Sequence, residues 1–186
     1  MKYLTLFLMI TVVLASCGTT GEESQQNVEP AKQTAEEVYE ELQNSIGSLE
    51  DEVNALTTQD IDLKRNLLGN YTSFANKYPQ DDMTAEYLFR AGKLANEIGK
   101  PRKAIDLLMN AHDGHPKFDK RTETAFLIGF IYENVLNDRI KAQEAYEKVI
   151  EFYPESPWAA DAQSSIELLY LTDEQKILKF KEKNQN

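Results

Sequence analysis

The sequence predicts an all-α protein: a short solenoid of antiparallel helix pairs, preceded by an acidic amphipathic helix. Apolar residues recur every three or four positions along residues 31–56 and 60–171, which is the period of an α-helix. In addition, the dipeptides Tyr78-Pro79, His115-Pro116 and Tyr153-Pro154 are 37 and 38 residues apart. An internal period of this length is typical of stacked helix pairs.

The composition narrows the range of functions. The chain has 20 Lys and Arg against 31 Asp and Glu, for a formal net charge of −11. A nucleic-acid partner is not expected, because binding to phosphates needs clustered Lys and Arg and no such cluster is present. One cysteine excludes an internal disulfide framework and a Cys-based zinc site. A binding or scaffolding protein without a cofactor is favoured over an enzyme.

Residues 1–16 have the pattern of a processing signal. Lys2 precedes a continuous apolar run over residues 3–14, which is shorter than the roughly 20 residues that span a bilayer as a helix. The run ends in Leu14-Ala15-Ser16-Cys17, which resembles the lipobox of bacterial lipoproteins. This resemblance implies cleavage before Cys17, diacylglyceryl transfer to its thiol and acylation of the new amine. The alternative is a free cysteine that packs as a small apolar side chain.

Residues 17–30 would then form the lipidated cysteine and its tether. Between residues 18 and 30 only Val28 is a sizeable apolar residue, so this segment cannot bury enough surface to fold. Its Glu22-Glu23 pair is compatible with the surface-export signals that some lipoproteins carry after the cysteine. The periplasmic face of the outer membrane is the expected location, and the cell surface is the alternative.

Residues 31–59 contain the acidic amphipathic helix. Two arrangements remain open for its apolar stripe: an oligomeric coiled coil through residues 35–56, or packing on the next helix of the same chain. The second is favoured, because three heptads make a short coiled coil and Gly47 weakens it. The stripe alternates spacings of four and three, and consists of Ala35, Tyr39, Leu42, Ile46, Leu49, Val53 and Leu56.

Residues 60–171 carry the repeated units. Small residues recur at matching places before each proline, where two helices of a hairpin can approach closely. The proline itself ends the second helix, since it cannot continue a helix and it disfavours helical backbone at the residue before it. These positions are Gly92, Ala104, Ala111 and Pro116 in one unit, and Gly129, Ala142, Val149 and Pro154 in the next.

The spacing of Gly, Ala after 12 residues, a small residue after 7 and Pro after 5 resembles the tetratricopeptide repeat. The second unit departs from it by one extra residue in the turn at 137–139 and by Val149, and the unit ending at Pro79 lacks the small residues. Lipobox, acidic helix and repeats, in this order, resemble outer-membrane tetratricopeptide lipoproteins. Among these are the lipoprotein of outer-membrane assembly and the cell-division coordinators that accompany the Tol-Pal system.

The resemblance implies a concave protein-binding surface formed by the first helix of each unit. Phe89, Phe126 and Phe130 are its candidate exposed anchors, although at least one of them could instead belong to the core between helices. The implied surface residues are Glu86, Phe89, Lys93, Asn96, Phe126, Phe130, Glu133 and Asn134.

The two histidines and the single tryptophan are weak candidates for a metal or ligand site. His112 and His115 are the only histidines, and two ligands leave a zinc site incomplete, so no metal site is expected. His115 occupies the place of Tyr78 and Tyr153 in the other units, which favours a packing role in the turn. Trp158 is expected in the core. No catalytic residues are assigned.

Residues 172–186 form the last expected element. Thr172 and Gln175 have capping-box spacing ahead of three apolar residues, Ile177, Leu178 and Phe180. We expect a helix that covers the open end of the solenoid, with lysines on a solvated face.

Together these features predict a membrane-anchored adaptor that binds envelope proteins or peptides through the repeats. The alternative is a structural oligomer or spacer that assembles through residues 35–56.

Overall fold

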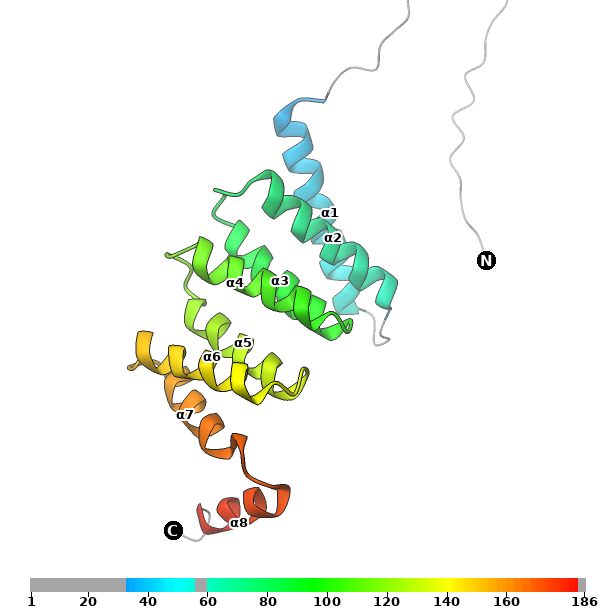
Figure 1. Ribbon diagram of the computed structural model, residues 1–186. Coiled ribbons are helices and arrows are strands. Elements are labelled where there is room, and N and C mark those ends of the chain that lie inside the picture. Colours follow the sequence, from blue (N-terminus) through cyan, green and yellow to red (C-terminus); the bar gives the residue numbers. More distant parts are fainter. Residues whose placement is uncertain (1–32, 56–59, 184–186) are drawn as a thin grey trace, which may run out of the picture. The chain divides into compact units, whose positions relative to one another are not determined.

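The computed structural model describes residues 33–55 and 60–183. The lipobox at Leu14-Ala15-Ser16-Cys17, the tether at 17–30, Leu56 and the turn at 57–59 lie outside these ranges. Within them every regular element is an α-helix, as the sequence predicted (Figure 1). The helices are α1 (Ala35–Ala55), α2 (Ile61–Lys77), α3 (Thr84–Glu97), α4 (Pro101–Gly114), α5 (Arg121–Asn134), α6 (Arg139–Phe152), α7 (Pro157–Leu169) and α8 (Asp173–Lys183).

Polar side chains define where several helices begin. At α2 the Asp60 carboxylate accepts hydrogen bonds from two backbone amides in the first turn, at 3.0 Å each. At α8, Thr172 and Gln175 form the expected reciprocal capping box. An unexpected capping box joins Thr34 and Glu37 at the start of α1. Each satisfies amides that the helix itself leaves unpaired.

The second helix of each pair ends where the prolines predict. Helices α2, α4 and α6 stop before Tyr78, His115 and Tyr153, the residues that immediately precede the three prolines. The expectation drawn from this spacing is therefore confirmed.

Successive helices pack against each other in chain order from α1 to α7, and α5 also contacts α7. In Figure 1, α2, α4 and α6 lie in front of α1, α3 and α5. The all-helical stack of adjacent pairs agrees with the expected solenoid.

Glycines lie where the paired helices approach most closely. A Cβ atom at Gly92 would be 2.6 Å from Cγ of Leu108, and one at Gly129 would be 2.6 Å from Cε1 of Tyr146. Both distances are too short for real carbon contacts, so a side chain at either position would force the Leu108 or Tyr146 side chain, or its helix, to shift. The other small positions of the repeat signature are fully buried: Ala104, Ala111, Ala142 and Val149.

The apolar stripe of α1 packs within the chain. Ile46 is 1% exposed and belongs to the same buried cluster as Leu68 and Phe74 of α2. Tyr39, Leu42, Leu49 and Val53 are half-buried against that cluster, whereas Ala35 is exposed. The favoured intrachain arrangement is the one observed, and it covers the surface that a coiled coil through residues 35–56 would use.

The expectation that residues 172–186 cover the end of the stack is wrong for α8. Its apolar side chains Ile177, Leu178 and Phe180 are exposed. The physical reason lies in α7, whose exposed residues Ala160, Asp161, Gln163 and Ser164 are small or polar and offer little apolar surface to cover. A stack that ends on such a face needs no further cover.

No helix in the described ranges combines the length and apolar character needed to cross a bilayer.

Candidate protein-binding surface

A chain of ion pairs joins the first helices of successive pairs. Arg90 of α3 contacts Glu50 of α1 through Nη1 at 2.9 Å and Glu86, one turn earlier on α3, through Nε at 2.7 Å. The other Glu86 oxygen accepts a hydrogen bond from Nζ of Lys120, just before α5, also at 2.7 Å. Tyr71 of α2 donates to Glu50 at 2.6 Å. Glu86, one of the residues implied for the binding surface, is thus used in ion pairs within the chain.

This network alters the proton affinities of its members. Burial alone would raise the pKa of Glu86, but the hydrogen bonds from Lys120 and Arg90 outweigh it and hold that pKa below the ordinary 4.5. Burial alone would lower the pKa of Arg90, whereas Glu86 and Glu50 raise it above its ordinary value. Burial, reinforced by Glu50, raises the pKa of Tyr71. Glu86 and Arg90 are therefore charged at neutral pH, and Tyr71 is a neutral hydrogen-bond donor.

Phe89 is not an exposed anchor, which corrects the sequence expectation. Its side chain is only 4% exposed. The Phe118 ring, from the turn between α4 and α5, lies 6.0 Å from the Phe89 ring, and the Nζ atoms of Lys93 and Lys120 each lie 5.4 Å from its centre. The turn of the next pair covers this ring, a contact that one helix's periodicity cannot reveal. Lys93, above the ring, remains exposed.

Phe126 is half-buried and faces the following helices. Its ring centre lies 5.3 Å from that of Tyr146 and 5.0 Å from that of Trp158, so Trp158 packs at the edge of the second core cluster, as expected. Glu133 accepts a hydrogen bond from the Tyr146 hydroxyl at 2.8 Å. Burial, followed by this contact with Glu133, raises the pKa of Tyr146.

The remaining implied residues are more accessible. Phe130 is 42% exposed, and the exposed Asn134 donates to the Phe130 carbonyl at 3.1 Å. Asn96 is half-buried, and its buried Oδ1 has no hydrogen-bond partner among the residues that the structure describes. Of the eight implied surface residues, Lys93, Phe130 and Asn134 are therefore the exposed ones.

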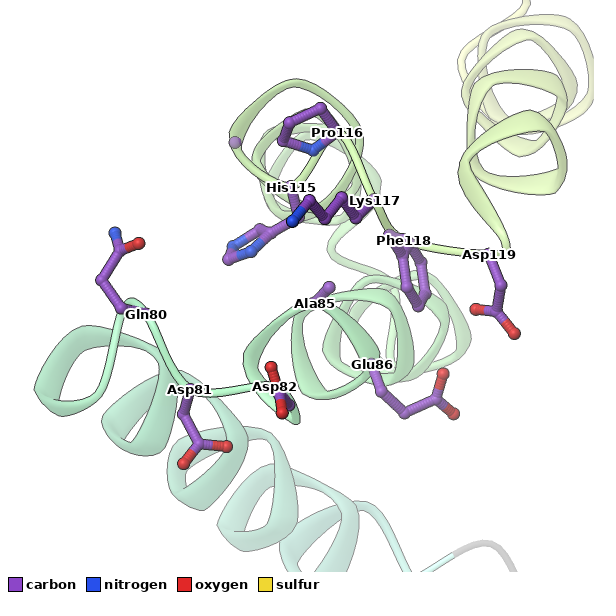
Figure 2. A pocket seen from close by; sticks show the side chains of 11 residues that line it. Gln80, Asp81, Asp82, Ala85, Glu86, His115, Pro116, Lys117, Phe118 and Asp119 are labelled. Atoms are coloured by element: carbon purple, nitrogen blue, oxygen red, sulfur yellow. The ribbon is translucent and has the colours of Figure 1, made fainter.

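A hollow of about 550 Å³ lies where the turn before α3 faces the turn after α4. Figure 2 shows Asp81 and Asp82 on one side of it and His115 on the other. Asp81 is already engaged, since it accepts from the hydroxyl of Tyr39 at 3.1 Å and from the backbone amide of Met83 at 2.8 Å. Asp81 and Asp82 from the turn before α3 and Asp119 from the turn after α4 thus line the hollow, together with Lys117.

His112 is held by neighbours. Nε2 lies 2.7 Å from the Tyr153 hydroxyl, and Nδ1 lies 2.5 Å from Oδ1 of Asp113. His115 is half-buried in its turn. Across the described residues no three His, Cys, Asp or Glu side chains are placed to hold a metal ion.

Sequence reasoning missed most of the ion-pair network. The spacing of Glu86 and Arg90, four apart on one helix, could have suggested their pairing. Glu50 and Lys120 lie 40 and 34 residues from their partners, and only the packing of consecutive helix pairs brings them together.

Comparison with known families adds evidence for the last complete pair. Residues 123–156 match the tetratricopeptide repeat. The match spans most of α5, all of α6 and the turn that follows, including Gly129, Ala142 and Pro154. Helices α3 and α4 each have 14 residues, as do α5 and α6, so the preceding pair has the same dimensions as the matched tetratricopeptide repeat. No curated protein matches the chain significantly.

The tetratricopeptide repeat is a non-catalytic unit of protein–protein interaction. The match therefore supports a tetratricopeptide protein with a general adaptor role.

Proposed function

We propose that this chain is a lipid-anchored adaptor of the bacterial envelope, which binds proteins or peptides along the first helices of its repeats. The observation that carries the adaptor role is the tetratricopeptide match on α5 and α6 within a stack of helix pairs. The binding surface centres on Lys93, Phe130 and Asn134, because their side chains are exposed while the neighbouring aromatics are used in packing.

An aromatic and a basic side chain are suitable groups for such a surface. Interface energy concentrates in a few anchors, and aromatic and basic residues are frequent among them. Phe130 supplies apolar area that is not needed by the core, and Lys93 supplies a charge above the buried Phe89 ring. A partner segment with an apolar side chain and a carboxylate would match both.

The anchor is proposed from the sequence pattern around Cys17. Three acyl chains would exceed the two signals that stable membrane attachment needs, and residues 17–30 would form the lipidated cysteine and the tether between the helices and the bilayer. The periplasmic face of the outer membrane is the proposed location, by the resemblance to tetratricopeptide lipoproteins.

The anchor is tested by Cys17→Ser in the full chain. We expect this variant to remain unlabelled by radioactive palmitate and to leave the outer-membrane fraction, because the acylated thiol is absent. A folded Cys17→Ser protein that is labelled and fractionates like the wild type would contradict the lipoprotein proposal.

The binding surface is tested by placing a photo-crosslinking residue at position 130 or, as a control, at position 140. Ile140 is also exposed, but it lies at the start of α6, a second helix. In intact envelopes we expect crosslinked products from position 130 and few from position 140. The reverse pattern would move the binding surface to the second helices.

A further inference from the structure

Helix α8 presents an apolar surface that nothing in the described part of the chain covers. Ile177, Leu178 and Phe180 are 54%, 59% and 68% exposed. Ile177 and Phe180 are three residues apart, so they are neighbours on one face of the helix. Burial of their exposed apolar surface against an apolar medium is favourable.

The attachment of α8 to the stack leaves this patch open. Lys179 Nζ contacts Glu167 of α7 at 2.7 Å. Successive helical residues are rotated by about 100°, so Ile177 points about 160° away from Lys179, and Phe180 about 100° away. The side of α8 that carries Lys179 therefore faces α7, and Ile177 and Phe180 point away from α7.

The charge around the patch indicates what covers it. Residues 176–183 contain four lysines and one glutamate, in a chain whose net charge is −11. A helix with apolar residues flanked by lysines suits an anionic bilayer surface, where the apolar side chains enter the acyl boundary and the lysines reach the headgroups. The rest of the acidic chain would be repelled by that surface, so the contact would be confined to α8.

We propose that α8 binds the surface of an anionic lipid bilayer. This inference does not depend on the proposed lipidation of Cys17. With the anchor in place, α8 would be a second and weaker contact, and it would fix the orientation of the repeats relative to the membrane.

A second copy of the chain is a poorer occupant. The apolar hollow that could receive α8 lies between α4, α5 and α6, and is lined by Met109, Ile128, Tyr132 and Phe152. Its charged lining is mixed, with Lys141 and Lys148 beside Asp113 and Glu144. Such a rim offers the lysines of α8 no net attraction.

Lipid binding also explains how so short a helix would gain stability. Helices below about 12 residues are marginal in water, and α8 has 11 residues, with the Thr172–Gln175 capping box at its start. We expect its helicity to rise when it enters the interface.

The test uses residues 18–186, which contain the whole unit formed by residues 34–186 and lack Cys17. Co-sedimentation is measured with vesicles of phosphatidylcholine alone and with an equal mixture of phosphatidylcholine and phosphatidylglycerol. We expect binding to the mixed vesicles that weakens with added salt, little binding to the neutral ones, and a gain in helical circular dichroism on binding.

Two variants and a control locate the contact. Ile177→Ser with Phe180→Ser, and Lys176→Gln with Lys181→Gln, should each weaken binding about tenfold or more, since apolar insertion and charge both contribute. Phe152→Ser, which removes a 63% exposed ring from α6, should bind as the wild type does. The changed side chains are exposed except that of Lys176, which is half-buried. Thermal unfolding checks that the stack is intact.

Three outcomes would overturn the proposal: failure of the wild type to bind the mixed vesicles, unchanged binding by the α8 variants, or equal loss in Phe152→Ser. Concentration-dependent self-association in light scattering, abolished by the α8 variants, would assign the patch to a second copy instead.

Discussion

Substitution of two helical glycines separates the effect of close packing on stability from the effect of helix propensity. Gly129 faces Tyr146, where a Cβ atom would be 2.6 Å from the ring, whereas Gly69 on α2 has nothing within 4 Å of that position. We expect Gly129→Ala to destabilise the protein by about 1–3 kcal/mol through overpacking. Gly69→Ala should stabilise it by about 0.5–1 kcal/mol, because alanine restricts the unfolded chain and favours helix. Urea unfolding measures both.

Equal effects of the two substitutions would show that α5 and α6 do not approach each other as described. The same comparison tests the repeat register, because Gly129 is placed by its distance from Ala142 and Pro154.

The charge of Glu86 should make the free energy of unfolding depend on pH in the acidic range. Its pKa is lower in the folded protein than the ordinary 4.5, so the carboxylate contributes stability that is fully present above pH 4.5 and is lost as pH falls through the lowered value. Glu86→Gln removes this contribution. We expect the wild type to be more stable than the variant at neutral pH, and the difference to shrink below pH 4.5.

Denaturant midpoints of the two proteins across this pH range provide the measurement. A difference that stays constant with pH would mean that Lys120 and Arg90 do not stabilise the Glu86 carboxylate.

At the level of single helices, α1 is the element whose role the sequence left open. Its buried Ile46 packs on α2, so Ile46→Ala should lower the free energy of unfolding by about 2–5 kcal/mol. Because the packing is within one chain, the unfolding midpoint of the wild type should not depend on protein concentration. An oligomer joined through α1 would instead be stabilised by higher concentration.

Unfolding at a low and a high protein concentration, with light scattering of the soluble chain, separates the two arrangements. A midpoint that rises with concentration, and loses this dependence in Ile46→Ala, would restore the oligomeric spacer as the better account.

The helices themselves were predictable because their signals are local. Periodicity, the residues before Pro79, Pro116 and Pro154, and the Thr172 capping box each act within a few residues of the structure they specify. The failures concern α8 and Phe89. Whether α8 covers the end of the stack depends on the outer face of α7, and whether Phe89 is exposed depends on Phe118, 29 residues later.

At the scale of the whole molecule, the candidate site was also predictable only as far as local sequence signals reach. The periodicity of α3 and α5 places Glu86, Phe89, Phe126 and Glu133 on the faces implied for binding. This periodicity does not show that residues distant in the sequence contact these four side chains. The contacting residues are Lys120, Phe118, Trp158 and Tyr146. What remains exposed is smaller than the sequence suggested, and it rests on Lys93, Phe130 and Asn134.

The central claim is that the first helices carry the binding surface, and the most direct test compares two double variants. Lys93→Ala with Phe130→Ala changes α3 and α5. Lys148→Ala with Phe152→Ala changes α6 and also removes one exposed lysine and one exposed aromatic ring. Because the changed side chains are exposed, both proteins should unfold close to the wild-type temperature.

The measurement is quantitative capture of crosslinked partners from intact envelopes by the wild type and both variants. We expect the Lys93 and Phe130 variant to lose the wild-type partners and the Lys148 and Phe152 variant to retain them. Retention by the first variant and loss by the second, with both proteins folded, would contradict the account and assign binding to the second helices.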